Sequence, residues 1–417
     1  METKEIRIED TPNISIVNTL KGWFSKEFKE PFVSLFLCTT GDLLTGIAMG
    51  IFTSNLKMLP ALIILIPAAI GMRGNIFASL GSRLGTYLHT GQITPDFKKS
   101  RILNQNVSSS ATLTLITSIY LGILSALVAS IIGLEADVID MLLISTAAGF
   151  LSAVIMLIFT VVIAFLSYRR GWDPDNMTAP LITLVGDMLT LPFLFVSLIF
   201  VLGITYEIKM MFLAVIVILT LITIPYSLSE KSKPYYSSIL RESLPVLLVC
   251  GFLGIFSGAI LGGRIEGLIA VPSILIMLPA FLEDGGAIGG ILAARLSSSL
   301  HLGSIETKRG IPKNVLKMFV TMHILGIIIF TMVGSFAYII AKFLGISSLP
   351  LHLTIAVALL AGEMLIVVVN LIAYYISIIS FKRGVDPDNV TIPTITSTID
   401  LIGTACLIAV LIIMGMI

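Results

Sequence analysis

The stretch GWDPDNMTAPLITLVGD at residues 171–187 occurs a second time as GVDPDNVTIPTITSTID at residues 384–400. The copies are separated by a constant offset of 213 residues, and ten of the seventeen positions are identical. Each copy begins in a polar loop and continues into a long apolar segment that contains its last aspartate, Asp187 or Asp400. An ionisable side chain inside a membrane segment is costly unless it has a partner, and it therefore usually marks a functional pathway.

The composition identifies the class of protein. The chain has 417 residues, of which 56% are hydrophobic and 12% are charged, and its mean hydropathy is +1.02. Because soluble domains carry about 25% charged residues, this composition indicates a polytopic membrane protein embedded in a lipid bilayer. The net charge of +1 gives no reason to expect a nucleic acid partner. No apolar core of a signal peptide precedes Pro31, so we expect no cleaved leader.

The apolar segments predict an all-α protein with about eleven membrane helices. A helix needs about 20 apolar residues to cross the hydrocarbon core. The segments that meet this length are 32–54, 58–80, 110–133, 138–167, 178–203, 209–227, 244–263, 267–292, 318–344, 352–380 and 392–416. Before them, residues 14–28 have apolar side chains at helical spacing, which predicts a short helix in the membrane interface or an ordinary packed helix.

Loop charges predict the orientation of these helices. With the N-terminus on the cytoplasmic side, the inner segments contain 19 of the 26 lysines and arginines. Lysine and arginine accumulate in cytoplasmic loops, so we expect a cytoplasmic N-terminus and, after an odd number of spans, an extracytoplasmic C-terminus. The predicted location is the cell membrane.

The repeat extends well beyond the opening stretch. Residues 67–91 match residues 279–303 at an offset of 212. We therefore predict a cytoplasmic segment at 1–30, a first five-helix repeat at 31–205, a linker helix and loop at 206–240, and a second five-helix repeat at 241–417. One linker helix after five spans gives both repeats the same orientation, which predicts a pseudo-two-fold axis along the membrane normal.

The repeated aspartates are the leading candidates for a metal site. Each lies about ten residues into its helix, which is roughly 15 Å and so near the middle of a ~30 Å core. The same helix faces carry Thr183 and Thr396 one turn earlier, with Ala179 and Ile392 one turn before those. Oxygen ligands suit a hard cation such as Mg²⁺, and two facing carboxylates would repel each other without one.

Acidic and polar residues near this face are accessory candidates. The segment GMRGN at 71–75 becomes EDGGA at 283–287, so that Glu283 and Asp284 appear only in the second copy. We expect either that Arg73 pairs with one of these acids across the pseudo-two-fold axis, or that the two acids form a second cation site. Further accessory candidates are Asn75, the loop acids Asp173 and Asp386, and more weakly Asp42 and Glu363. The loop acids either attract cations at the inner mouth or simply start a helix.

Two segments of the sequence resemble a known family. The segments PALIILIPAAIGMRGNIFASLGSRL at 60–84 and DPDNMTAPLITLVGDM at 173–188 are similar to the membrane domain of the MgtE magnesium transporters. Their doubling in one chain resembles the eukaryotic solute-carrier branch of that family. The resemblance implies a pore between two five-helix units and divalent cation transport, with Mg²⁺ as the leading substrate and Mn²⁺ or Co²⁺ as alternatives. It also implies that the pore aspartates are Asp187 and Asp400, and a monomer with an internal pseudo-dimer is expected.

Two other functional classes fit part of the pattern. A carrier of another small solute coupled to Na⁺ or H⁺ would also need buried acids in its membrane helices. An intramembrane aspartyl protease would need two membrane aspartates that share a proton. Such proteases resemble one another in a GxGD string, whereas Asp187 follows LVG and Asp400 follows STI. We therefore expect a transporter rather than an enzyme.

Overall fold

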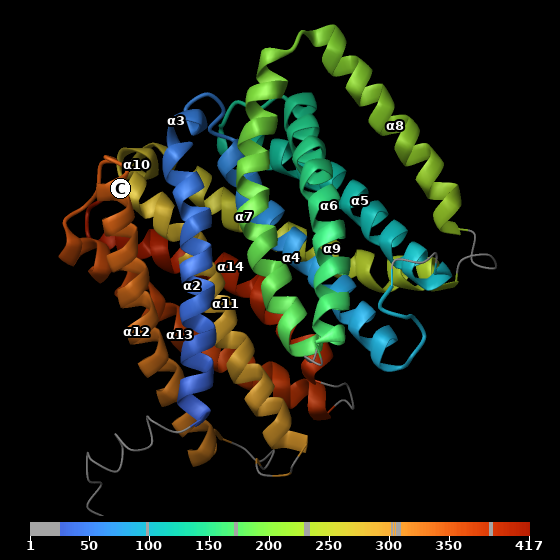
Figure 1. The fold of residues 1–417 in the computed structure, drawn as a ribbon. Helices are drawn as coiled ribbons and strands as arrows, with labels where there is room; N and C mark the ends of the chain where they lie inside the picture. The colour runs from blue at the N-terminus through green and yellow to red at the C-terminus, as the bar shows by residue number, and fades with distance from the viewer. Residues whose placement is uncertain are drawn as a thin grey trace, which may run out of the picture.

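The computed structural model describes residues 26–96, 100–170, 174–228, 234–301, 303, 305, 310–382 and 387–417, and the elements in these residues are all helices (Figure 1). Ten of the described helices are long and apolar enough to cross a membrane, and α2 adds a shorter apolar part at Leu35–Ile51. The prediction of an all-α polytopic membrane protein is confirmed. The interfacial helix predicted at 14–28 falls almost entirely outside the described residues.

The two repeats contain equivalent sets of helices. The first has α2 (Lys26–Ile51), α3 (Thr53–Leu56), α4 (Leu62–His89), α5 (Arg101–Ile132), α6 (Val138–Arg169) and α7 (Pro174–Gly203). The second has α9 (Pro234–Gly262), α10 (Ile265–Ala270), α11 (Pro272–His301), α12 (Lys313–Phe343), α13 (Leu351–Lys382) and α14 (Pro387–Ile413). The linker helix α8 (Tyr206–Leu228) lies between them in the chain.

The short helices α3 and α10 were not predicted from the apolar segments. The segment expected at 267–292 is interrupted at Val271, which has φ −126° and ψ 72° before Pro272 begins α11. The helical region is sterically disfavoured for a residue that precedes proline, which favours a break there. The equivalent break in the first repeat lies between α3 and α4, at residues 57–61, where Leu59 precedes Pro60. Hydropathy alone does not detect such breaks, because the flanking residues remain apolar.

Capping residues define the turn between α5 and α6. Gly133 ends α5 in the left-handed conformation with φ 83°. The Asp137 carboxylate then accepts hydrogen bonds from the backbone N–H groups of Ile139 (2.7 Å) and Asp140 (3.2 Å) at the start of α6. These two devices satisfy backbone groups that a helix end would otherwise leave without partners.

The first helix of each repeat packs on the second helix of the other repeat. Helix α2 lies along α11, and α9 lies along α4 (Figure 1). A Cβ atom added to Gly46 would collide with the carbonyl oxygen of Ile276, and one added to Gly258 would collide with that of Ile64. Both partners of each contact are related by the offset of 212. The glycines allow helix backbones to touch, and they join the repeats to each other.

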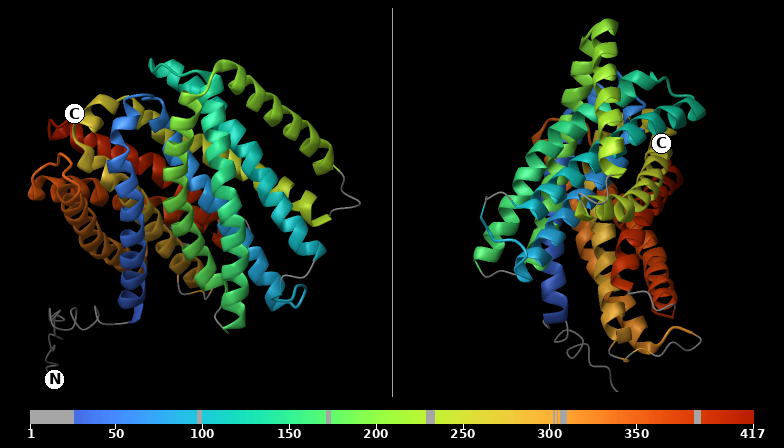
Figure 2. Two further views of the ribbon diagram at one scale, coloured as in Figure 1. Left: turned by 45° about the horizontal axis from the view of Figure 1, so that its top comes forward. Right: turned by 90° about the vertical axis from the view of Figure 1, so that its right-hand side faces the viewer.

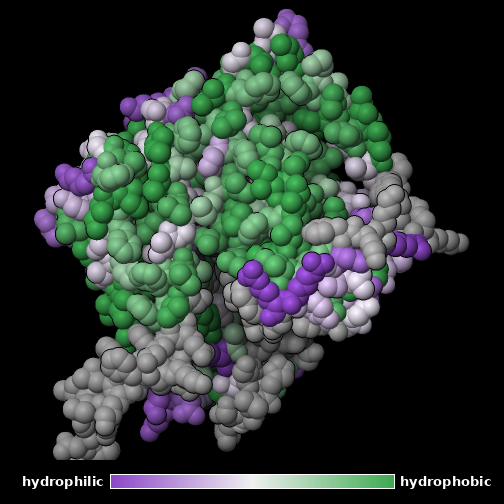
Figure 3. All heavy atoms as spheres, viewed as in Figure 1, coloured by the Kyte–Doolittle hydropathy of each residue, from purple (hydrophilic) through white to green (hydrophobic). Residues whose placement is uncertain are grey.

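Helix α8 lies at the edge of the bundle, where the three views place it beside the helices of the first repeat (Figure 1 and Figure 2). None of its apolar stretch is buried. An ion pair of 2.6 Å between Lys209 Nζ and Asp140 Oδ1 attaches its beginning to α6. The face seen in Figure 3 is predominantly hydrophobic with polar atoms towards its rims, as expected for a surface in contact with lipid.

Candidate functional site

The two repeated aspartates both lie inside the protein. Asp187 on α7 is only 1% exposed, and Asp400 on α14 is partly buried. Asp400 Oδ2 lies 3.7 Å from the point where a Cβ atom of Gly71 on α4 would stand, so it faces a helix of the other repeat. Asp187 lies within electrostatic range of Asp400, Glu283 and Asp42. Both carboxylates therefore belong to one electrostatically connected region.

The predicted threonines approach glycines on the neighbouring helices. Thr183 lies against Gly74, where its Cγ2 atom would be 3.1 Å from an added Cβ. Thr396 lies against Gly286, with a corresponding distance of 3.9 Å. The absence of side chains at these glycines lets α7 and α14 approach α4 and α11 closely. Of the other sequence candidates, Asp173 and Asp386 and the side chains of Ala179 and Ile392 lie outside the described residues.

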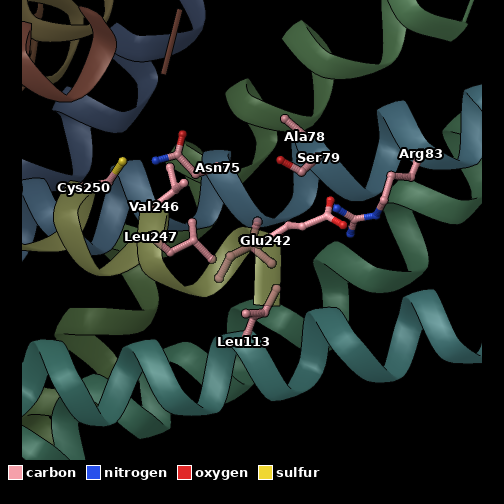
Figure 4. A pocket seen from close by; sticks show the side chains of 11 residues that line it. Asn75, Ala78, Ser79, Arg83, Leu113, Glu242, Val246, Leu247 and Cys250 are labelled. Carbon is pink, nitrogen blue, oxygen red and sulfur yellow. The ribbon is translucent and has the colours of Figure 1, made fainter. Parts of the chain in front are cut away.

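Asn75 lines a cavity of about 260 Å³ between α4, α5 and α9. Figure 4 shows Asn75 and Cys250 towards one end of this cavity, and Glu242 and Arg83 towards the other. The Arg83 Nε–H group donates a hydrogen bond of 3.0 Å to Asn106 Oδ1. Cys250 is close enough to Asp400 to be affected by its charge. The cavity thus approaches Asp400 from the α4–α9 side.

The predicted ion pair between Arg73 and the acids of the second repeat is wrong. Arg73 is 2% exposed, and its Nη2 group donates a hydrogen bond of 2.8 Å to Ser118 Oγ on α5. Residues two apart on a helix point about 200° apart, so the face of α4 that turns Gly71 towards Asp400 turns Arg73 away from it. Asp284 is instead held by Thr39, whose hydroxyl lies 2.9 Å from each carboxylate oxygen.

Sequence reasoning missed or undervalued three residues on α2. Thr39 contacts Asp284, Asp42 is 3% exposed within range of Glu283 and Asp284, and Thr45 is 1% exposed. Asp42 was expected only as a weak accessory candidate, and the threonines were not considered. Their common spacing of three residues is the signal that could have found them, because it places them on one helix face.

The carboxylates do not form a closed cage. In the part of the chain that the structure describes, no three carboxylate, imidazole or thiol groups converge as they would around a dehydrated metal ion. Mg²⁺ gives up its water reluctantly and is usually held through one or two carboxylates with several waters retained. The arrangement is therefore compatible with an ion that keeps part of its hydration shell.

Comparisons with known proteins identify the family. The MgtE family model, described as a divalent cation transporter, matches residues 66–197 and 278–410. The chain belongs to the MgtE family. The two matched segments confirm that the MgtE unit is duplicated within this chain. Membership in this family of transporters also excludes the protease alternative.

Animal solute carriers are similar to this MgtE-family chain over most of its length. It is 25% identical over 390 residues to solute carrier family 41 member 3 of Rattus norvegicus, covering 88% of this chain and 84% of the relative. It is 26% identical over 382 residues to solute carrier family 41 member 2 of Xenopus laevis, covering 84% of this chain and 65% of the relative. No solved structure matches the fold.

Proposed function

We propose that this MgtE-family chain carries Mg²⁺ between its two repeats, with Asp187 and Asp400 as the principal ligands. The supporting observation is that equivalent carboxylates from the two repeats both lie inside the protein, Asp187 buried and Asp400 partly buried and facing Gly71 of the other repeat. Asp187 Oδ1 is buried and has no hydrogen-bond partner in the described part of the chain. A divalent cation would supply the positive charge that two such carboxylates require.

The ion would cross the site with part of its hydration shell. Thr183 and Thr396 lie one turn from the aspartates and would bind the retained waters through their hydroxyl groups. Such indirect binding is weak enough to allow the ion to leave, as conduction requires. Mn²⁺ and Co²⁺ share the preference of Mg²⁺ for six-fold coordination and are the alternative substrates to be compared with it.

The cavity beside Asn75 would be the inner vestibule of this pathway. It lies towards the ends of α4 and α9 that the loop charges assign to the cytoplasmic side, and it ends close to Asp400. The N-terminus would accordingly be cytoplasmic and the C-terminus extracytoplasmic. Repeats at 31–205 and 241–417, joined by the linker at 206–240, would form the pathway within a single chain.

Transport in proteoliposomes tests the assignment. The full chain should fill liposomes with Mg²⁺, reported by an enclosed fluorescent indicator, while the double variant Asp187→Asn and Asp400→Asn should fall to the level of empty liposomes. Asparagine keeps the side-chain volume but removes both charges that hold the ion.

Glu363→Gln is the matched control, because it neutralises an acid within a membrane helix, on α13, that takes no part in the proposed site. It should transport at the parental rate. Undiminished flux in the double aspartate variant, with normal elution on size exclusion, would refute the assignment. Repeating the assay with imposed Na⁺ and pH gradients separates a coupled carrier from a channel.

A further inference from the structure

The two interfaces between the repeats differ where equivalent residues meet. At the α2–α11 interface, the Thr39 hydroxyl donates to the Asp284 carboxylate at 2.9 Å. The equivalent residues at the α9–α4 interface are Gly251 and Met72, and they also meet, because a Cβ on Gly251 would lie 2.9 Å from Met72 Cε. The same contact is therefore polar on one side of the molecule and apolar on the other.

Two further equivalent pairs show the same difference. Asp42 on α2 corresponds to Gly254 on α9, and Glu283 on α11 corresponds to Gly71 on α4. Gly254 packs closely on the backbone of α4, where an added Cβ would collide with Ala68. The duplicated fold can thus close this interface without acids, so the acids on the other side are not required for packing.

The acids gather where α2 meets both α11 and α7 (Figure 1). We call this place the acidic junction; its residues are Thr39, Asp42, Thr45, Asp187, Glu283 and Asp284. None of its carboxylates forms an ion pair with a lysine, arginine or histidine in the described part of the chain. The buried arginine of α4 does not compensate them, because Arg73 turns to Ser118 on α5.

Two polar groups at the junction are buried without a partner in the described part of the chain. One is Asp187 Oδ1. The other is the Thr45 hydroxyl. Its equivalent, Ser257, lies 2.9 Å from the backbone carbonyl of Asp400 and 2.6 Å from the Thr404 hydroxyl. Buried polar groups normally have partners, so these two point to a ligand.

One ion between the paired aspartates would leave the other acids of this region without a counter-charge. A divalent cation between Asp187 and Asp400 would neutralise only that pair. Asp42 and Asp284, which are buried, and Glu283, which is partly buried, would remain, and each would have to be neutralised either by a proton or by a second cation.

We propose that the acidic junction holds a second hydrated divalent cation, next to the ion held by the paired aspartates. Asp42, Glu283 and Asp284 supply its charge, Thr39 and Thr45 supply hydroxyl groups, and Asp187 is shared between the two ions. Repulsion between neighbouring ions helps each of them to leave, as in other multi-site pathways. This inference rests on the proposed function, because it assigns a second position to the same substrate.

Binding of Mn²⁺ to the purified full chain tests the proposal, with free Mn²⁺ measured by electron paramagnetic resonance. The parental protein should bind a second Mn²⁺ per chain, and the double variant Asp42→Asn and Glu283→Gln should bind only one. The single variant Asp400→Asn, which lies outside the junction, should keep the junction ion while weakening binding of the other. Glu363→Gln should bind as the parental protein does.

Flux gives an independent readout in case the double variant fails to fold. The single variant Glu283→Gln should lower flux at limiting Mg²⁺ by roughly tenfold, since cation affinity depends on the number of charged ligands. The proposal would be overturned if the parental protein bound a single Mn²⁺ per chain, with protons in place of a second ion on the junction carboxylates. Those results would not affect the assignment of Asp187 and Asp400. That assignment is tested separately, by the flux of the double variant Asp187→Asn and Asp400→Asn.

Discussion

At the level of Gly251 and Gly254, α9 meets α4 through glycine, methionine and alanine, whereas at the equivalent level α2 meets α11 through threonine and buried acids. The helices are equivalent, and the glycine contacts of Gly46 and Gly258 with the opposite backbone are the same in both interfaces. Duplication in one chain explains how this difference could arise. A homodimer has to place the same residue in both interfaces, whereas a fused pair can keep one for packing and add charge to the other.

The interiors of the two repeats differ in a similar way. Arg73 and Ser118 form a buried polar contact in the first repeat, next to Gly149. In the second repeat the position of Ser118 is taken by Phe330, whose ring packs against Gly362. The second repeat carries instead a hydrogen bond of 2.6 Å between His323 Nδ1 and Glu363 Oε2. Polar groups away from the pathway have thus diverged, while the shared aspartates have not.

The largest effect is expected where the two interfaces are alike. Gly46→Ala and Gly258→Ala should each lower the free energy of unfolding by about 3 kcal/mol or more, because each new methyl group would meet a backbone carbonyl that cannot move independently. Chemical denaturation in detergent micelles measures this. Gly203→Ala is the control, since an added Cβ there has no neighbour within 4 Å. Clearly unequal losses at Gly46 and Gly258 would show that the packing is less symmetric than the contacts indicate.

A smaller effect is expected where the interfaces differ. Thr39→Ala should lower the free energy of unfolding by about 2 kcal/mol in metal-free buffer, because Asp284 loses its hydrogen-bond donor while remaining buried. Adding Asp284→Met should restore much of this loss, since it recreates the apolar contact of the other interface. If the double variant were less stable than Thr39→Ala alone, the apolar contact would not be transferable between the two sides.

The smallest effect concerns the interior of the second repeat. His323→Ala should lower the free energy of unfolding by about 1 kcal/mol, the typical net value of a hydrogen bond, because Glu363 loses its partner. Flux of Mg²⁺ should not change, since the pair lies between α12 and α13 away from the proposed pathway. Thermal and denaturant unfolding give the first quantity and the liposome assay gives the second. A large loss of flux would mean that this pair belongs to the transport mechanism.

Much of the fold could be predicted because hydropathy and repetition are local properties of the chain. The approximate number of membrane helices followed from segment length. The wrong pairing of Arg73 has a physical origin. Aligning the repeats shows which residues are equivalent, but it does not show which residues touch, so Arg73 was paired with acids that lie beyond the opposite face of α4.

The sequence by itself determined that the chain spans the membrane many times, that it contains one unit twice, and that an aspartate recurs at the same depth in both copies. Only the tertiary structure decided that each first helix packs on the other repeat, and that Thr39, Asp42 and Glu283 therefore meet near Asp187. The physical reason is that helix periodicity fixes the direction of a side chain relative to its own helix, whereas packing between backbones fixes which helix stands opposite.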